Sequence, residues 1–314
     1  MMGSERLDIS VENLWLCWQE YKKGKKKCLE FLKFEAKLEK NLFELANDLN
    51  SGKYRHGGYF SFVVRDNKKR LISVASIRDR VVHRLLYKYL VKIYDHRFDF
   101  DIWSCRRDKG LVAAIFRCRT LAKKYSLGYF WRADIRKFFE NVDKQILLKI
   151  LNSSISDKTA MVLVEKIVIS FGRGLSIGNL TSQILANIYL NEFDRFVRNE
   201  LKPQAYMRYG DDFILFEDNP DSLIFKQKSA IDFLNNELKL EINSRISFLG
   251  KISNGIRFLG CLISPGEINL NRRNKKRIFR KLNSKNISSY YGLLQKFGDN
   301  DLKNRLTWEL FDHT

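Results

Sequence analysis

The chain has 314 residues, which is long enough to bury a sizeable core. Its 57 Lys and Arg against 36 Asp and Glu give a formal net charge of +21, which indicates a polyanionic partner such as a nucleic acid. The five cysteines are odd in number and include no Cys-x-x-Cys, which argues against a disulfide framework and against structural zinc. That cysteine pattern fits a reducing cytoplasm, where we expect the protein. We find neither a signal peptide nor a bilayer-length apolar run, so we expect no membrane partner.

The first part of the chain predicts helices followed by a basic hairpin. Residues 9–50 place apolar and Lys- or Glu-rich positions at helical spacing. Residues 59–64 and 71–75 have the composition of paired strands, and Arg65 and Arg70 flank the turn between them. These cations could bind an anionic ligand, and a solvated turn is the alternative.

A packed helix is expected over 76–98. Ser76 and Asp79 have the spacing of a capping box, and apolar residues follow them at helical spacing. A further pair of helices is expected over 143–171, and another helix around 233–240.

One acidic side chain ends a predicted strand. Asp134 follows the strand-prone residues 129–131, and the aromatic residues Phe138 and Phe139 come shortly after it. Asp often caps a helix after a strand, so capping is the alternative to metal binding at Asp134.

Two further carboxylates lie at the tip of a predicted hairpin. The strand-prone residues 206–209 and 213–216 flank Gly210, Asp211 and Asp212, and glycine supplies the backbone freedom of a tight turn. Adjacent carboxylates repel each other unless a divalent cation neutralises them, and hard oxygen ligands suit Mg²⁺. A solvated turn is the alternative. Together with the preceding acid, these residues could bind the two Mg²⁺ ions of a polymerase site.

A glycine-rich loop precedes an amphipathic helix. Residues 172–183 begin Gly-Arg-Gly-Leu-Ser and continue Ile-Gly-Asn-Leu-Thr-Ser-Gln, and the apolar residues that follow recur at helical spacing. Glycine permits close approach of the backbone to a ligand. The polar residues at the helix start offer contacts, namely Asn179, Thr181, Ser182 and Gln183. An ordinary capped helix is the alternative.

Together and in this order, these segments resemble the palm motifs of reverse transcriptases, and the resemblance runs over nearly the whole chain. Residues 177–183 are similar to the Ile/Val/Leu-Gly-x-x-x-Ser-Gln form of diversity-generating retroelement reverse transcriptases, whereas most other reverse transcriptases have Gln-Gly-x-x-x-Ser-Pro. Within this group II intron and retron-like superfamily, the Asn-Ala-x-x-His and Val-Thr-Gly of retrons are not found. The Tyr-Gly-Asp-Asp of residues 209–212 has Gly where Ala or Met is commoner, and in this it resembles viral RNA polymerases.

The resemblance implies an α+β right-hand polymerase fold with fingers, a palm of antiparallel sheet plus helices, and a small helical thumb. It divides the chain into an N-terminal extension with the fingers (1–125), the palm (126–262, with finger-palm helices near 143–171) and the thumb (263–314).

The resemblance also implies roles for individual residues. Phe139 would lie beneath the sugar of the incoming nucleotide, where its ring would clash with a ribose 2′-hydroxyl. This argues for deoxynucleotides, and core positions for both Phe138 and Phe139 are the alternative. The implied set comprises catalytic and metal-binding Asp134, Asp211 and Asp212, with Ile135 beside them in the metal site; nucleotide-binding Arg65, Arg70, Ile135, Phe139, Ile177 and Gln183; and a primer grip at Phe258, Leu259 and Gly260.

The expected activity is that of an RNA-directed DNA polymerase, in which a primer 3′-hydroxyl attacks the α-phosphorus of a dNTP at a site with two Mg²⁺ ions. The resemblance implies a bacterial or phage-encoded diversity-generating retroelement enzyme of low fidelity. Such an enzyme copies a template-repeat RNA into adenine-mutagenised cDNA for mutagenic retrohoming, with a basic helical accessory variability protein as partner. A group II intron-like, retron or antiphage-defence reverse transcriptase is the alternative among enzymes. A catalytically silent RNA-binding scaffold is the alternative outside them.

Overall fold

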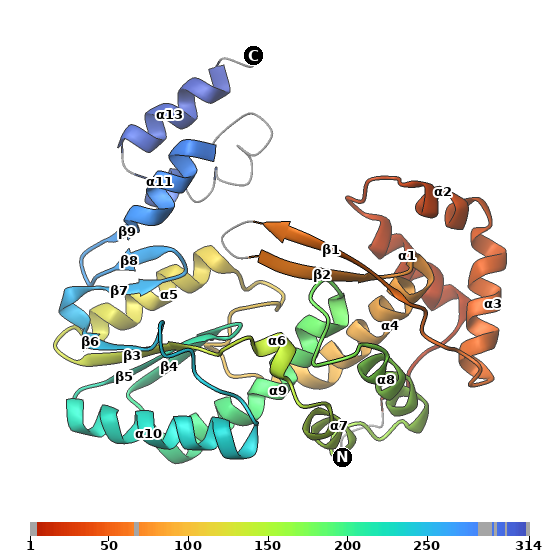
Figure 1. The fold of residues 1–314 in the computed structure, drawn as a ribbon, viewed down its shortest axis with the longest axis horizontal. Coiled ribbons are helices and arrows are strands. Elements are labelled where there is room, and N and C mark those ends of the chain that lie inside the picture. The colour runs from red at the N-terminus through yellow and green to blue at the C-terminus, as the bar shows by residue number, and fades with distance from the viewer. Residues whose placement is uncertain (1–4, 66–68, 282–290, 292–293, 299, 312–314) are drawn as a thin grey trace. The chain divides into compact units, whose positions relative to one another are not determined.

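The computed structural model describes most of the chain, and Figure 1 shows its helices and strands. The tip of the first hairpin, residues 66–68, and several residues of the predicted thumb lie outside the described part. The described residues are 5–65, 69–281, 291, 294–298 and 300–311.

The chain forms two compact units, each assembled from separated stretches of sequence. Asp134 ends one stretch of the second unit, and Ile135 begins one of the first. The division into fingers, palm and thumb stays a prediction. The first unit comprises Met1–Asp99, Ile135–Phe196 and Asp232–Glu241, and the second comprises Phe100–Asp134, Val197–Ile231 and Ile242–Thr314.

The first unit is mainly helical and contains one antiparallel pair of strands. Tyr59 pairs with Ala75 and Arg65 pairs with Lys69 at the two ends of this pair. The predicted hairpin, the N-terminal helices and the helix pair over 143–171 are confirmed. The elements of this unit are α1 (Val11–Lys22), α2 (Leu29–Ala36), α3 (Leu38–Asn50), β1 (Tyr59–Arg65), β2 (Lys69–Ala75), α4 (Ile77–Tyr94), a 3₁₀ turn (Asp95–Arg97), α6 (Phe138–Asn141), α7 (Lys144–Asn152), α8 (Lys158–Ser170) and α9 (Leu180–Phe196).

The predicted cap of α4 is confirmed in its Ser76 half, and Asp79 bonds the Ser76 hydroxyl. The hydroxyl of Ser76 accepts the backbone N–H of Asp79 at 3.2 Å and donates to the Asp79 carboxylate at 2.6 Å. The regular helix ends at Tyr94, earlier than the predicted span, and the 3₁₀ turn continues it.

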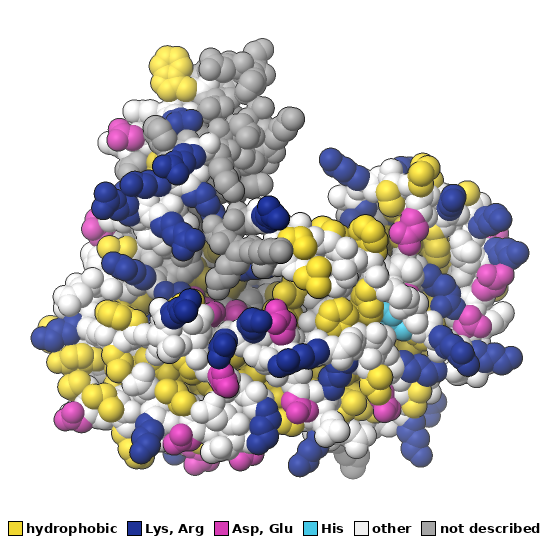
Figure 2. Space-filling view, viewed as in Figure 1, with side chains coloured by type: hydrophobic (Ala, Val, Ile, Leu, Met, Phe, Trp, Pro, Cys, Tyr) yellow, Lys and Arg dark blue, Asp and Glu magenta, His cyan; other side chains and the backbone are white. Residues whose placement is uncertain are grey.

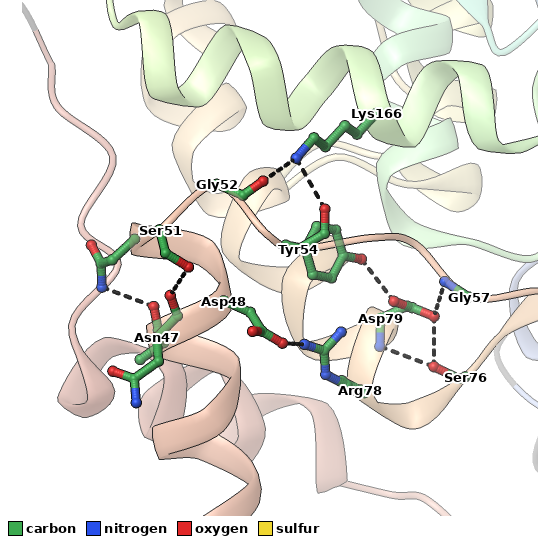
Figure 3. Close-up of polar contacts among 12 residues, drawn as sticks. Asn47, Asp48, Ser51, Gly52, Tyr54, Gly57, Ser76, Arg78, Asp79 and Lys166 are labelled. Carbon is green, nitrogen blue, oxygen red and sulfur yellow. Dashed lines mark hydrogen bonds and ion pairs between the residues drawn. The ribbon is translucent and has the colours of Figure 1, made fainter.

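Figure 3 shows how the segment between α3 and β1 is held in place. The Nζ of Lys166 on α8 donates to the carbonyls of Gly52 at 2.8 Å and Tyr54 at 3.0 Å. The carboxylate of Asp79 accepts the Tyr54 hydroxyl at 2.7 Å and the Gly57 N–H at 3.1 Å. Because Asp79 is buried, these bonds replace the water it gives up, and they connect the entry to the hairpin with α4.

The second unit is built around two antiparallel sheets. One sheet has the order β4-β5-β3-β6 and the other β7-β8-β9. The predicted hairpin at residues 206–216 and the strand before Asp134 are confirmed. The elements are α5 (Leu111–Lys124), β3 (Tyr129–Asp134), a π-helical turn (Val197–Leu201), β4 (Ala205–Tyr209), β5 (Asp212–Glu217), β6 (Phe248–Lys251), a 3₁₀ turn (Ile252–Asn254), β7 (Ile256–Phe258), β8 (Cys261–Ile263), β9 (Ile268–Leu270), α11 (Arg272–Lys281) and α13 (Asn300–Phe311).

One face of the four-stranded sheet packs into the core of the second unit. Successive side chains of a strand point to opposite faces, and Phe130, Met207, Ile214 and Phe216 share the buried face. The helix α5 covers this core with its own buried residues. Arg132 and Asp134 continue the alternation from Phe130 along β3, so they stand on the same face of the sheet.

The helix expected around 233–240 is α10 (Pro220–Glu237), which begins in the second unit and ends in the first. The expected bounds were wrong at both ends, because the helix begins at Pro220 and ends at Glu237. The Oδ1 of Asn219 accepts the N–H groups of Asp221 and Ser222 at 2.8 and 3.1 Å, and Pro220 occupies a first turn in which its missing N–H costs nothing. No helix in the described part of the chain is both long and apolar enough to cross a membrane.

Candidate active site

Asp211 and Asp212 lie where the chain turns between β4 and β5. Tyr209 pairs with Asp212, so Gly210 and Asp211 form the turn. Gly210 has a φ of 66°, which strains a residue that carries a Cβ, and its N–H donates to the Oγ of buried Ser104 at 2.9 Å. The turn is therefore anchored, with Asp211 at the tip and Asp212 at the first position of β5.

The strand β3 brings Asp134 beside this hairpin. Asp134 pairs directly with Asp212, and directly opposed residues project from the same face of a sheet. The Asn243 backbone N–H donates to the Asp134 carbonyl at 2.8 Å, and the Asn243 side chain donates to its carboxylate at 3.4 Å. The N-cap residue of α6 is Lys137, so the capping alternative for Asp134 is excluded.

Burial dominates the electrostatics of the two acids at the turn. The pKa of Asp211 is raised to about 7, first by burial and then by the charge of Asp134. Burial also raises the pKa of Asp212 to about 6, although Arg132 acts in the opposite direction. Both acids are half-buried, and the Asp212 side chain is 15% exposed, whereas a solvated turn would leave them open to water.

Arg132 is a site residue that the sequence analysis missed. Its Nε and Nη2 donate to the two carboxylate oxygens of Asp212 at 2.8 and 2.6 Å. Arg132 stands two positions before Asp134 in a strand, and this spacing places both on one face. That alternation was the signal available in the sequence.

A divalent cation fits the pair formed by Asp134 and Asp211. Two repelling carboxylates are stabilised by a cation, and their oxygens are the ligand type that Mg²⁺ prefers. Among the residues that the structure describes, no group of three or more His, Cys, Asp or Glu side chains is arranged to hold a metal ion. The side chain of Ile135 is buried, so only its backbone could contribute to such a site.

In the first unit, the glycine loop is joined to α6 and β2. The Leu175 N–H donates to the Phe139 carbonyl at 2.7 Å, and the Ser73 N–H donates to the Ile177 carbonyl at 2.8 Å. Gly174 has a φ of 63°, and a Cβ there would lie 2.1 Å from the Phe139 oxygen. Only glycine permits this close approach. It holds Phe139, in α6, against the glycine loop that carries Ile177, and both residues are predicted to bind the nucleotide.

Only one of the two adjacent phenylalanines is a core residue. Phe138 is 3% exposed, whereas Phe139 is half-buried. Their rings meet edge to face with centroids 5.4 Å apart. The ring of Phe139 therefore keeps an accessible surface that could meet a ligand.

The side chains of Arg65 and Arg70 leave the hairpin on opposite faces. Val64 pairs with Arg70, and Arg65 is the next residue along β1, so it points to the other face. Ile72 shares the face of Arg70 and lies against Gly178, where a Cβ would be 2.9 Å from the Ile72 Cγ2. Arg70 therefore stands on the face of the hairpin that meets the glycine loop.

Asn179 holds the loop to β2 with its side chain. Its Oδ1 accepts the Ala75 N–H at 3.2 Å, and its Nδ2 donates to the Ser73 carbonyl at 3.2 Å and to the Ser176 hydroxyl at 2.5 Å. We expected Asn179 to offer ligand contacts, but these bonds engage it inside the protein. Gln183, in the first turn of α9, is exposed.

The predicted primer grip is the turn between β7 and β8. Phe258 pairs with Cys261, so Leu259 and Gly260 form the turn, with φ values of 48° and 84°. Asn274 fills the space beside Gly260, because a Cβ there would lie 2.0 Å from its Nδ2. The Phe258 side chain belongs to the core, so only Leu259 and Gly260 are open to a primer.

Cations gather on α11, as Figure 2 shows for one face of the molecule. The helix lies within residues 263–314, for which a small helical thumb was expected. The exposed cations on it include Arg272, Arg273, Lys276 and Arg280.

An antiparallel sheet with acids at a hairpin turn and on the adjacent strand, together with a basic helix, defines the class of nucleic-acid polymerases with a palm. The chain belongs to the reverse transcriptase (RNA-dependent DNA polymerase) family, whose sequence pattern matches residues 64–263. This membership confirms the predicted enzyme class, RNA-directed DNA polymerase.

Several curated proteins are similar in sequence. Protein YkfC of Escherichia coli K12 is 24% identical over 273 residues, which cover 72% of each chain. Nuclear intron maturase 4 of Arabidopsis thaliana is 24% identical, with 64% of this chain and 27% of that protein covered. The group II intron-encoded protein LtrA of Lactococcus lactis is 21% identical, with 63% and 45% covered. The chain thus spans less than half the length of the last two.

Among solved structures, the apo telomerase of Candida tropicalis truncated from its C-terminal domain is similar, with a TM-score of 0.50. The match covers 70% of this chain and 55% of the telomerase, at 14% identity. At that identity the likeness concerns the fold alone. It confirms the predicted α+β polymerase fold of the right-hand type.

Proposed function

We propose that this chain extends a primer on an RNA template with deoxynucleotides. The observation that carries the proposal is the arrangement of three half-buried carboxylates, in which Asp134 pairs with Asp212 across β3 and β5 and Asp211 follows at the hairpin turn. Burial first, and then the charge of Asp134, raises the pKa of Asp211 to about 7. A site that concentrates negative charge in this way is suited to divalent cations, and hence to phosphoryl transfer.

Individual residues would have distinct roles in this reaction. Asp134 and Asp211 would hold Mg²⁺, with the backbone of Ile135 beside them. When bound, the two ions would stabilise the attacking hydroxyl and the leaving oxygen. Arg70 would contact the triphosphate, since its charge can offset that of the phosphates. Phe139 would exclude a ribose 2′-hydroxyl by its bulk.

Two residues, a turn and a helix would orient the substrates. Ile177 and Gln183 would face the incoming nucleotide and its template base. The turn Leu259–Gly260 would support the primer end through its accessible backbone. The cations of α11 would follow the phosphates of the duplex without reading bases, because phosphate contacts carry no sequence information.

We further propose that the enzyme serves a diversity-generating retroelement. The support is the Ile-Gly-Asn-Leu-Thr-Ser-Gln of residues 177–183, which departs at both ends from the commoner reverse transcriptase motif. The enzyme would copy a template-repeat RNA into cDNA with errors at adenines, in the cytoplasm of a bacterium, with a basic helical accessory protein. The alternative is a group II intron-like enzyme, which the similarity to LtrA favours.

Primer extension by the purified chain tests the polymerase proposal. We expect Mg²⁺-dependent incorporation of dNTPs on an RNA template, and a loss of about a thousandfold or more in Asp211→Asn, because a two-metal site needs both acids. Asp218→Asn, which changes an exposed acid beyond β5, is the matched control and should keep the wild-type rate. Asp211→Asn that extends primers as fast as the control would refute the proposal. Wild-type protein that binds RNA but incorporates no dNTP would favour the scaffold alternative.

Sequencing of the cDNA distinguishes a diversity-generating retroelement enzyme from a group II intron-like enzyme. Errors concentrated opposite template adenines would support the retroelement assignment. Equal accuracy at all four template bases would favour the intron-like alternative.

A further inference from the structure

A cavity of about 720 Å³ opens among the helices of the first unit. Its lining comes from the end of α4 and the 3₁₀ turn after it, from α7 and the residues that follow it, from α9, and from the end of α10. Ligand pockets in proteins have volumes of roughly 300–1,000 Å³. No lining residue belongs to the candidate active site or to the glycine loop, so the proposed polymerase reaction leaves this cavity without a ligand.

Asn191 contributes a buried amide to the lining. The residue is 7% exposed, and its Oδ1 has no hydrogen-bond partner among the residues that the structure describes. Ile188, three positions earlier on α9, also lines the cavity and is fully buried. A buried polar atom without a partner destabilises the fold, and a ligand that donates a hydrogen bond to it removes this penalty. The cavity therefore contains an acceptor that the described protein does not satisfy.

The apolar part of the lining suits a flat ring. Tyr94 and Leu238 are buried, and the ring of Phe233 stacks on Phe196 with centroids 4.2 Å apart. The guanidinium carbon of Arg97 lies 5.2 Å from the centre of the Tyr94 ring. Nucleobases stack on aromatic rings and guanidinium planes, and a side-chain amide pairs with a base edge. The lining thus combines surfaces for the faces of a heterocycle with a partner for its edge.

Two charged side chains at this cavity lack a counterion. Arg195 is paired with Glu192, with 3.6 Å between Nη1 and Oε1. Lys149 on α7 and Glu237 at the end of α10 are exposed, and neither forms an ion pair within the described residues. An ammonium group can bind a phosphate, and a carboxylate can accept hydrogen bonds from ribose hydroxyls, as it does in dinucleotide-binding folds. A ligand that carries a phosphate and a ribose would engage both side chains.

We propose that this cavity is a second nucleotide-binding site, in which the Asn191 amide meets the edge of the base, Lys149 a phosphate and Glu237 the ribose hydroxyls. The inference goes beyond the proposed function, because no residue of the cavity takes part in the proposed primer extension. The amide suits adenine, whose amino group would donate to Oδ1 while its N7 accepts from Nδ2. A free nucleotide and an unpaired nucleotide of an RNA chain present the same three groups.

Isothermal titration calorimetry of the full chain with adenosine 5′-monophosphate tests the site. EDTA in the buffer removes divalent ions, so that the candidate active site holds no nucleotide through a metal. We expect Asn191→Leu, Lys149→Gln and Glu237→Gln each to weaken binding about fivefold or more, because each removes one contact. Lys158→Gln, at an exposed lysine outside the cavity, and Asp211→Asn, in the candidate active site, should keep the wild-type dissociation constant.

Ribose 5-phosphate, which lacks the base, distinguishes recognition of the base from recognition of the phosphate. Asn191→Leu should leave its affinity unchanged, whereas Lys149→Gln should weaken it as much as it weakens the nucleotide. Leucine has the branched shape of asparagine and leaves no buried amide unpaired, so the variant should melt no lower than the wild type. If it does not fold, Lys149→Gln and Glu237→Gln, at exposed positions, provide the test.

A single-stranded oligoribonucleotide of adenosine and uridine, measured by fluorescence anisotropy, distinguishes the two sources of the nucleotide. If the three cavity variants weaken binding of the monophosphate but not of the RNA, the site takes a free nucleotide. If they weaken RNA binding and Lys158→Gln does not, the site holds an unpaired nucleotide of the RNA. If none of them changes either affinity more than Lys158→Gln does, or if Asn191→Leu weakens ribose 5-phosphate as much as the nucleotide, the inference is wrong, and water satisfies Asn191 instead.

Discussion

The backbone N–H of Ser73 donates to the carbonyl oxygen of Ile177 at 2.8 Å, and this bond fixes the glycine loop against β2. The side chain of Ile177 takes no part in it and is half-buried. A substitution at Ile177 should therefore change what the loop presents to a nucleotide without removing what holds the loop.

Ile177→Gln should lower misincorporation, most strongly opposite template adenine. An amide can hydrogen-bond a correctly seated nucleotide, whereas Ile can only pack, and about 1.4 kcal/mol of added discrimination corresponds to a tenfold change. Sequencing of cDNA made on one RNA by both forms measures the effect. Ile169→Gln, at an exposed position on α8, is the control. An unchanged error spectrum would make Ile177 a packing residue and weaken the retroelement assignment.

Asn179→Ala should lower the free energy of unfolding by about 2–3 kcal/mol, because it removes two hydrogen bonds that hold the loop to β2 and a third to Ser176 within the loop, each worth about 1 kcal/mol. Urea denaturation measures the change. Asn236→Ala, on the exposed side of α10, should stay within about 0.5 kcal/mol of wild type. Equal stability of the two variants would show that the loop is held by other contacts.

Phe139→Ala should relax the selection of the sugar. Removing the ring opens space for a ribose 2′-hydroxyl, and we expect ribonucleotide incorporation relative to deoxynucleotide to rise about tenfold, which is about 1.4 kcal/mol of lost discrimination. The ratio of kcat/KM for the two nucleotides measures it. Phe225→Ala, which removes an exposed ring on α10, is the control. If selectivity is unchanged, Phe139 is a packing residue.

Acid should destabilise the first unit through His83. Its Nδ1 lies 2.5 Å from the Thr181 hydroxyl, and burial, aided by His56, lowers its pKa from 6.5 to about 3. Between pH 6.5 and about pH 3, His83 is protonated in the unfolded chain but stays neutral in the folded chain. Stability is therefore complete above pH 6.5 and is lost as pH falls toward 3, by at most about 1.4 kcal/mol per unit.

Urea midpoints at pH 7, 6 and 5 test this pH dependence. The stability advantage of the wild type over His83→Gln should shrink as the pH falls, since glutamine does not titrate. His96→Gln, at an exposed histidine, should leave the wild-type pH profile unchanged. A constant difference between wild type and His83→Gln across this range would contradict the prediction.

RNA affinity should fall steeply with salt. Each neutralised phosphate releases counterions, with a slope of about −0.7 per contact on single strands in a plot of log affinity against log salt. Arg273→Gln on α11 should reduce the slope by about 0.7 if this exposed cation contacts a phosphate. Affinity that does not change with salt would defeat the assignment of a basic RNA-binding surface.

The sequence alone determined the elements whose signals are local. The hairpin of β4 and β5 was predictable because strand-prone residues flank a glycine within a short stretch, and the cap of α4 because Ser76 and Asp79 are separated by a single helical turn. The start of α10 was missed although Asn219 and Pro220 carry a local signal for it. The acids Asp134, Asp211 and Asp212 were found by their order along the chain.

Tertiary structure alone decided which charges and faces meet. Arg132 and Asp212 are 80 positions apart in the chain, and they pair because the register of β3 against β5 makes them diagonal neighbours. Register likewise separated Arg65 from Arg70, and packing placed the Phe258 ring in the core. Because alternate residues of a strand point to opposite faces, a shift of one residue in the pairing of two strands would move each side chain of the shifted strand to the other face of the sheet. Residue identity sets which groups can react, and strand register determines which of them come into contact.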